Sequence, residues 1–180
     1  MTPHSPIHIA ILANVAVIRQ GITLLAALGD ARFTARIPVC YNASVGGHLR
    51  HIIEHYQSFL RGLHDGDIDY EDRPRDPLIE GRPNYAAGIM EEISDRLVAL
   101  STTLPNRALQ LCAETTEGAT TGTSVLRELE FLLSHTIHHN ALVAAMCKTL
   151  GIPIPERFGY APSTIAHLDR SACALSPSSR

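Results

Sequence analysis

Six of the ten histidines in this chain fall in two short stretches, "GHLRHIIEHY" and "SHTIHHN". They are His48, His51, His55, His135, His138 and His139. Neutral imidazole is the commonest protein ligand for transition metals. The two stretches therefore indicate a metal site, where a divalent ion would polarise a substrate or activate water.

The second stretch has the spacing of a metal-binding pair on a helix. Successive helical residues turn by about 100°, so His135 and His139 lie one turn apart on the same face. Two imidazoles at positions i and i+4 can share one ion. His138 lies about 60° to the side and is expected at the rim.

The first stretch would supply the third ligand. His48 and His55 border its apolar face, whereas His51 lies further round, so periodicity slightly favours His48 or His55 as the core-facing residue. Three histidines would leave a position open for water or substrate. Imidazole suits zinc, nickel, iron and copper alike, so the ion itself is not identified.

Four segments with helical apolar spacing must position these side chains. Ser44 and Ser124 are candidate N-caps, Pro105 ends the third segment, and Gly151 follows the fourth. The predicted helices cover residues 6–28, 44–63, 84–104 and 124–150.

The remaining segments are shorter or polar. Residues 64–83 are predicted to form a loop of about 20 residues, longer than ordinary connections, from which Tyr70 and Arg73 would cap the site. "ALQLCAETT" and "EGATTGTS" predict a short β-hairpin before the last long helix. The fold class is therefore mainly α, a four-helix bundle. Its domain spans residues 1–162, and the tail, 163–180, holds a short helix from Ser163 and a disordered end.

Composition narrows the function. The 180 residues are 45% hydrophobic and 18% charged, which suits a single soluble domain. The net charge is −3, and Lys148 is the only lysine, so no basic stripe indicates nucleic-acid binding. The four cysteines form no CxxC pair. Without a secretory signal, and with an apolar run (7–18) judged too short to span a bilayer, the protein is expected in the cytoplasm and not in a membrane.

The histidine motifs resemble those of the DinB-like superfamily, whose members are metal-binding four-helix bundles. "GHLRHII" stands at the family's second-helix histidine motif, and "HTIHH" stands at its H-x-x-x-H pair in the fourth helix. The resemblance covers most of residues 6–151. It implies His51, His135 and His139 as metal ligands, with His48 as the second choice on the second helix.

The resemblance also implies a range of functions. The chain would bind a divalent ion (zinc, nickel or iron) and act as a metal-dependent enzyme, such as a transferase using a low-molecular-weight thiol, or as a hydrolase-like relative. Relatives are commonly homodimers. The alternatives are a non-catalytic metal-binding or stress-response bundle, and a helical protein with incidental histidines. Glu128, on the same helical face as His135, would assist the site or only favour the helix dipole.

Overall fold

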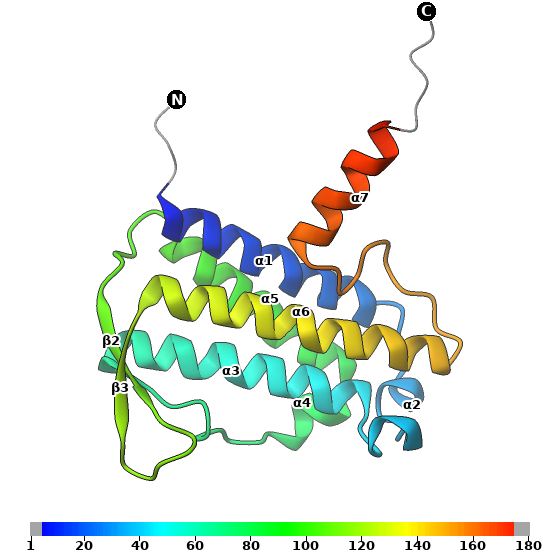
Figure 1. Ribbon diagram of the computed structural model, residues 1–180. Coiled ribbons are helices and arrows are strands. Elements are labelled where there is room, and N and C mark those ends of the chain that lie inside the picture. Colours follow the sequence, from blue (N-terminus) through cyan, green and yellow to red (C-terminus); the bar gives the residue numbers. More distant parts are fainter. Residues whose placement is uncertain (1–4, 175–180) are drawn as a thin grey trace, which may run out of the picture.

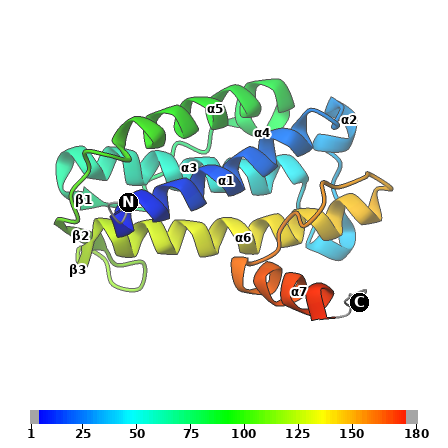
Figure 2. The ribbon, with the colours of Figure 1, turned by 90° about the horizontal axis from the view of Figure 1, so that it is seen from above.

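The structure is a computed structural model that describes the backbone of residues 5–174 and the side chains of residues 5–170. Four long helices lie side by side in one bundle (Figures 1 and 2). They are α1 (Pro6–Leu25), α3 (Val45–Asp65), α5 (Pro83–Leu100) and α6 (Val125–Thr149). Both α1 and α3 pack against α5 and α6. The predicted four-helix bundle is confirmed.

Hydroxyl side chains start the two helices that carry the histidines. The Ser44 side chain accepts a hydrogen bond from the Gly47 amide at 3.0 Å, and Ser124 accepts one from the Arg127 amide at 3.3 Å. Both predicted N-caps are confirmed. Helices α1 and α5 end three and four residues earlier than predicted, because the chain then tightens to i to i−3 hydrogen bonds, such as those from the Leu28 amide to the Leu25 carbonyl and from the Thr103 amide to the Leu100 carbonyl.

A small sheet closes one end of the bundle. Strands β2 (Ala108–Cys112) and β3 (Thr120–Ser124) form the predicted antiparallel hairpin, which leads directly into α6. Strand β1 (Asp67–Ile68) directly follows α3 and pairs parallel to β2. Helix α3 therefore ends at the sheet where α6 begins, so the two helices run antiparallel (Figure 1).

Two connections contain more structure than the sequence predicted. The expected loop over 64–83 holds the end of α3, strand β1 and helix α4 (Pro77–Gly81), so a structureless loop of that length was wrong. The connector between α1 and α3 holds α2 (Asp30–Phe33) and the 3₁₀ turn η1 (Pro38–Cys40). Elements of two to five residues are too short to leave a periodic apolar signal.

Helix α1 is longer than the apolar run (7–18) that was expected to be too short to cross a membrane. Of the described helices, α1 alone is long and apolar enough to cross a membrane, because its apolar character continues over 20 residues, beyond the run judged too short. Half of that window is buried in the bundle. Asn14 is fully buried there, where it donates to the Leu129 carbonyl at 2.9 Å and accepts from the Tyr56 hydroxyl at 2.6 Å. In this fold α1 is a core helix.

The C-terminal tail carries α7 (Pro162–Ala174), which confirms a helix near Ser163 and projects from the bundle (Figure 1). The predicted disorder of the last residues lies outside the described part of the chain. A domain boundary at residue 162 stays a prediction.

The close contact between α3 and α4 gives a first testable prediction. A Cβ built on Gly46 would clash with the backbone carbonyl of Glu80 and lie 2.9 Å from the Phe33 ring. We expect Gly46→Ala to lower the free energy of unfolding by about 1–3 kcal/mol, because backbone cannot yield as a flexible side chain can. Thermal melting measures this loss.

Gly88 on α5 is the matched control. A Cβ there meets nothing within 4 Å, so Gly88→Ala should raise stability by up to about 1 kcal/mol through helix propensity alone. Equal melting temperatures for the two variants would show that α4 does not lie this close to α3.

Candidate metal centre

The histidines of α3 and α6 meet across the antiparallel helix pair. His51 Nε2 lies 3.1 Å from His135 Nε2. One ring nitrogen from each of His51, His55 and His135 lies within 4.8 Å of the others. Side chains 84 positions apart in the chain thus converge at one point inside the bundle.

This donor set fits a metal ion. Two nitrogens bound to one tetrahedral ion at about 2.0–2.1 Å lie about 3.3 Å apart, close to the His51–His135 separation. His55 donates its Nδ1–H to the His51 carbonyl at 2.8 Å, which leaves a lone pair on Nε2. A hydrogen bond from the other ring nitrogen to a backbone carbonyl is one of the usual ways in which a metal-binding histidine is oriented.

Two further imidazoles extend the cluster toward the surface. His48 Nδ1 lies 2.9 Å from His139 Nδ1. The His139 ring is centred 4.5 Å from the His135 ring and 4.7 Å from the His51 ring. The histidine cluster, as we call His48, His51, His55, His135 and His139, therefore contains every ligand that the sequence predicted.

The structure makes His55, which periodicity offered as a core-facing residue but the family resemblance did not select, a candidate ligand beside His51. His51 and His135 form the common pair, and either His55 or His139 can supply the third nitrogen, so the exact ligand set stays a prediction. His55 is 4% exposed, in agreement with its position beside the apolar stripe of the sequence. Apolar periodicity was the signal for His55, whereas the family motif pointed to His51.

The cluster consists of neutral imidazoles. Burial, followed by repulsion from the neighbouring histidines, lowers the pKa of His51 to about 2. Burial is also the first cause that lowers the pKa of His135 to about 3 and the pKa of His139 to about 4. A metal ligand must be deprotonated, so these environments keep the lone pairs available near neutral pH.

The segment after β1 covers the cluster from one side. The Tyr70 ring stacks on His55, with centroids 5.1 Å apart and planes 14° apart. Its hydroxyl donates to the buried Glu128 carboxylate at 2.9 Å, and Thr123 and Arg127 also donate to Glu128. Burial and this carboxylate raise the pKa of Tyr70, so its hydroxyl stays a donor. Glu128 thus holds the aromatic side chain that orients His55.

Arg73 lies against the cluster in a way that opposes a metal ion. Its Nη1 donates to His51 Nδ1 at 2.6 Å, and its side chain is 11% exposed. A neutral His51 that binds metal through Nε2 carries its proton on Nδ1, which can no longer accept from a guanidinium. Metal binding therefore requires Arg73 to turn away from His51.

This conflict predicts that Arg73→Gln binds divalent metal more tightly than the unchanged protein. The substitution removes a cation beside the donors and offers an amide oxygen to the His51 Nδ1–H. We expect about a tenfold gain, equal to about 1.4 kcal/mol. Titration of zinc against a competing chelator measures it. Arg75→Gln, at an exposed position of the same segment, should change nothing. A weaker affinity in Arg73→Gln would show that the guanidinium assists the ion.

The fold and the site define a class: a four-helix bundle with a candidate metal centre of histidines between its second and fourth long helices. The model of the DinB family matches residues 11–161, and the chain belongs to the DinB family. The family assignment therefore agrees with the resemblance carried by the two histidine motifs.

The solved structure of YfiT from Bacillus subtilis, described as a probable metal-dependent hydrolase with an unusual four-helix bundle topology, matches with a TM-score of 0.60 and 16% identity. The match covers 80% of this chain and 87% of YfiT, and it shows the shared fold. FK506-binding protein 5 of Rhizopus delemar is 46% identical over 44 residues, which are 24% of this chain and 11% of that protein.

Proposed function

We propose that this member of the DinB family is a metal-dependent enzyme acting on a small molecule. The supporting observation is the histidine cluster, which is neutral, convergent and directly beside a pocket of about 320 Å³. A site that only stored or sensed an ion needs the ligands but no adjoining pocket. The pocket therefore favours catalysis over the non-catalytic alternative.

The side chains have distinct roles in this proposal. His51 and His135, with His55 or His139, would hold a divalent ion, which would supply Lewis-acid polarisation and lower the pKa of a water or thiol. The His51 carbonyl and the Tyr70 ring fix the orientation of His55. His48 lines the pocket and lies 2.9 Å from His139 (Nδ1 to Nδ1), so its ring is the one placed to exchange a proton with a substrate there.

Small-thiol transfer and hydrolysis are the two candidate reactions. The first is what the family resemblance implies for this chain. The second is supported by the structural similarity to YfiT, which is itself described as a probable metal-dependent hydrolase. They differ in the attacking group, a thiolate or a water, and a divalent ion held by the same histidines would favour deprotonation of either one.

Two measurements test the proposal in order. Metal analysis of the purified protein should give about one divalent ion per chain, and added zinc or nickel should raise the melting temperature of protein stripped by a chelator. The metal-loaded protein is then assayed with glutathione, bacillithiol and mycothiol as thiol donors, and with simple esters and amides as hydrolytic substrates.

Each outcome has a defined meaning. Turnover that disappears in His135→Ala supports the enzyme. Stoichiometric metal without turnover on any of these substrates supports the non-catalytic metal-binding bundle. No bound metal and no thermal shift would leave the histidines as incidental residues of a helical protein.

A further inference from the structure

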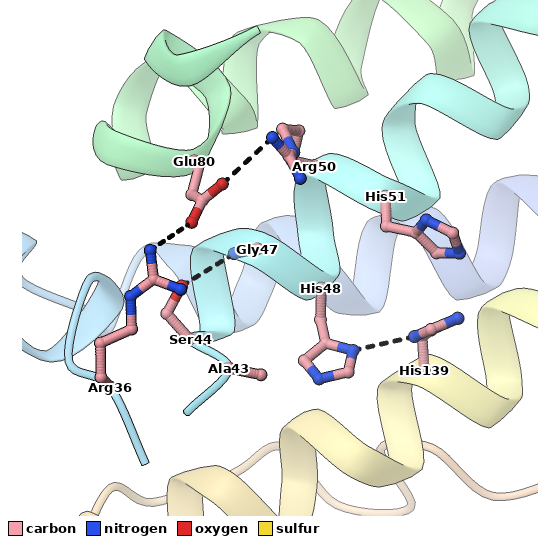
Figure 3. A pocket seen from close by; sticks show the side chains of 9 residues that line it. All are labelled: Arg36, Ala43, Ser44, Gly47, His48, Arg50, His51, Glu80 and His139. Carbon is pink, nitrogen blue, oxygen red and sulfur yellow. Dashed lines mark hydrogen bonds and ion pairs between the residues drawn. The ribbon is translucent and has the colours of Figure 1, made fainter. Parts of the chain in front are cut away.

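The pocket beside the cluster has two chemically different walls (Figure 3). Histidines form the wall nearer the cluster, namely His48, His51 and His139. Charged side chains line the other wall, namely Arg36, Arg50 and Glu80. At about 320 Å³ the pocket is at the lower end of the volumes of small-molecule sites. A molecule bound in it touches both walls.

The charged wall carries an excess of positive charge. Glu80 bridges the two arginines, with its Oε1 3.1 Å from Arg36 Nη2 and its Oε2 3.2 Å from Arg50 Nη1. One carboxylate between two guanidiniums leaves a net charge of about +1 on this wall. Glu80 also fixes the direction of both guanidiniums, because it holds one nitrogen of each.

Arg50 retains unused hydrogen-bond donors. Its side chain is 25% exposed, and its Nε is buried without a hydrogen-bond partner among the residues that the structure describes. A buried donor without a partner is costly, and a guanidinium presents its N–H groups in a fork that matches a carboxylate or a phosphate. The exposed part of the Arg50 side chain, which lines the pocket, is therefore the part that an oxygen anion can reach, whereas the buried Nε is not accessible to one.

The first turn of α3 keeps the pocket open between the two walls. Gly47 lines the pocket, and a Cβ built there lies 3.4 Å from Ser44 Oγ and 3.6 Å from Glu80 Oε1. A methyl group fits at ordinary contact distance, whereas a larger side chain at this position fills the pocket. The positive end of the α3 dipole adds to the charge of the arginines at this end of the helix.

We propose that this pocket is the substrate site and that Arg50, supported by Arg36, binds an anionic oxygen group, a carboxylate or a phosphate, of a small-molecule substrate. The remainder of that molecule then reaches the histidine wall. The assignment as a substrate site rests on the proposed function, whereas anion binding itself does not require a metal ion. The proposed function and anion binding at this pocket can therefore fail separately.

The test uses three small probes on the full chain, both stripped of metal and loaded with zinc. Succinate and methyl phosphate carry the two candidate anions, and succinamide is the uncharged analogue of succinate. Binding is followed by NMR chemical-shift changes of the His48 and Arg50 signals. We expect at least one anion to bind both forms and succinamide to bind at least tenfold more weakly.

Three variants locate the binding. Arg50→Gln should lower the affinity for the anion at least tenfold, while the zinc affinity, measured separately, stays unchanged. Gly47→Leu should abolish anion binding by filling the pocket and should retain the fold. Arg96→Gln, at an exposed position on α5, should behave as the unchanged protein.

The result that overturns the proposal is equally specific. If neither anion binds, or if succinamide binds as well as succinate, the pocket is not an anion site. The same holds if Arg50→Gln and Arg96→Gln weaken binding equally. Loss of zinc binding with anion binding intact would instead remove the proposed function and leave the anion site standing.

Discussion

Purified His135→Ala protein should contain less than about a tenth of the metal found in the unchanged protein. His135 belongs to both ligand sets that the geometry allows, and its Nε2 lies 3.1 Å from that of His51. Removing it leaves two nitrogens for the ion, and we expect affinity to fall at least about 100-fold, more than the 10–100-fold typical of residues that only orient a ligand. Elemental analysis and zinc titration measure the loss.

The third ligand is decided by comparing two further alanine variants. If His55 completes the site, His55→Ala should lose metal as His135→Ala does, and His139→Ala should weaken binding less than about tenfold. If His139 completes it, the order reverses. The structure places His55, His51 and His135 nitrogens within 4.8 Å of one another, so we expect the first result.

His64→Ala is the matched control, because His64 lies on α3, as His51 and His55 do, with a side chain that is 92% exposed and outside the cluster. It should keep full metal content. All variants must first show an unchanged helical circular dichroism spectrum, because His55 is buried and its loss leaves space in the core. Full metal content in His135→Ala would refute a site built on the two helices.

The sequence predicted the long elements because their signals are local. Ser44 and Ser124 act as caps through their own neighbouring amides, and the apolar spacing of the four segments repeats over many turns. Helix α4 and strand β1 left no such signal. Their positions depend on contacts distant in sequence, such as the approach of Glu80 to Gly46 and the pairing of Ile68 with Leu111.

In the candidate site, too, some features could be predicted from local sequence and others could not. The i, i+4 spacing of His135 and His139 was enough to place them on one face, and the family motif selected His51. Spacing on one helix cannot show which residue of a partner helix lies opposite, and that is decided by the antiparallel alignment of α3 and α6. Arg73 and Tyr70 were expected over the site, but the opposition between Arg73 and His51 is visible only from the 2.6 Å contact of their nitrogens.

The metal-free protein should lose stability as the pH falls below neutrality. Imidazoles in the unfolded chain take up protons near their ordinary pKa of 6.5, whereas folding lowers the pKa to about 4 at His139, about 3 at His135 and about 2 at His51. Between these values the unfolded state binds more protons, so the free energy of unfolding decreases as the pH decreases. The stabilisation is fully present above pH 6.5 and is lost toward pH 4 and below.

Melting curves from pH 7.5 to 5 measure this dependence. These rings are partly solvated, so we expect a combined loss of only about 2 kcal/mol over that range, which corresponds to a fall in melting temperature of about 4–8 °C. The double variant His51→Gln, His135→Gln should show a shallower fall, whereas His64→Gln should keep the full slope. With saturating zinc the melting temperature should rise by about the same amount at each pH in this range, because the folded imidazoles, with pKa values of about 2 to 4, carry almost no proton that the ion must displace. If the double variant kept the full slope, the acid sensitivity would come from groups other than the cluster.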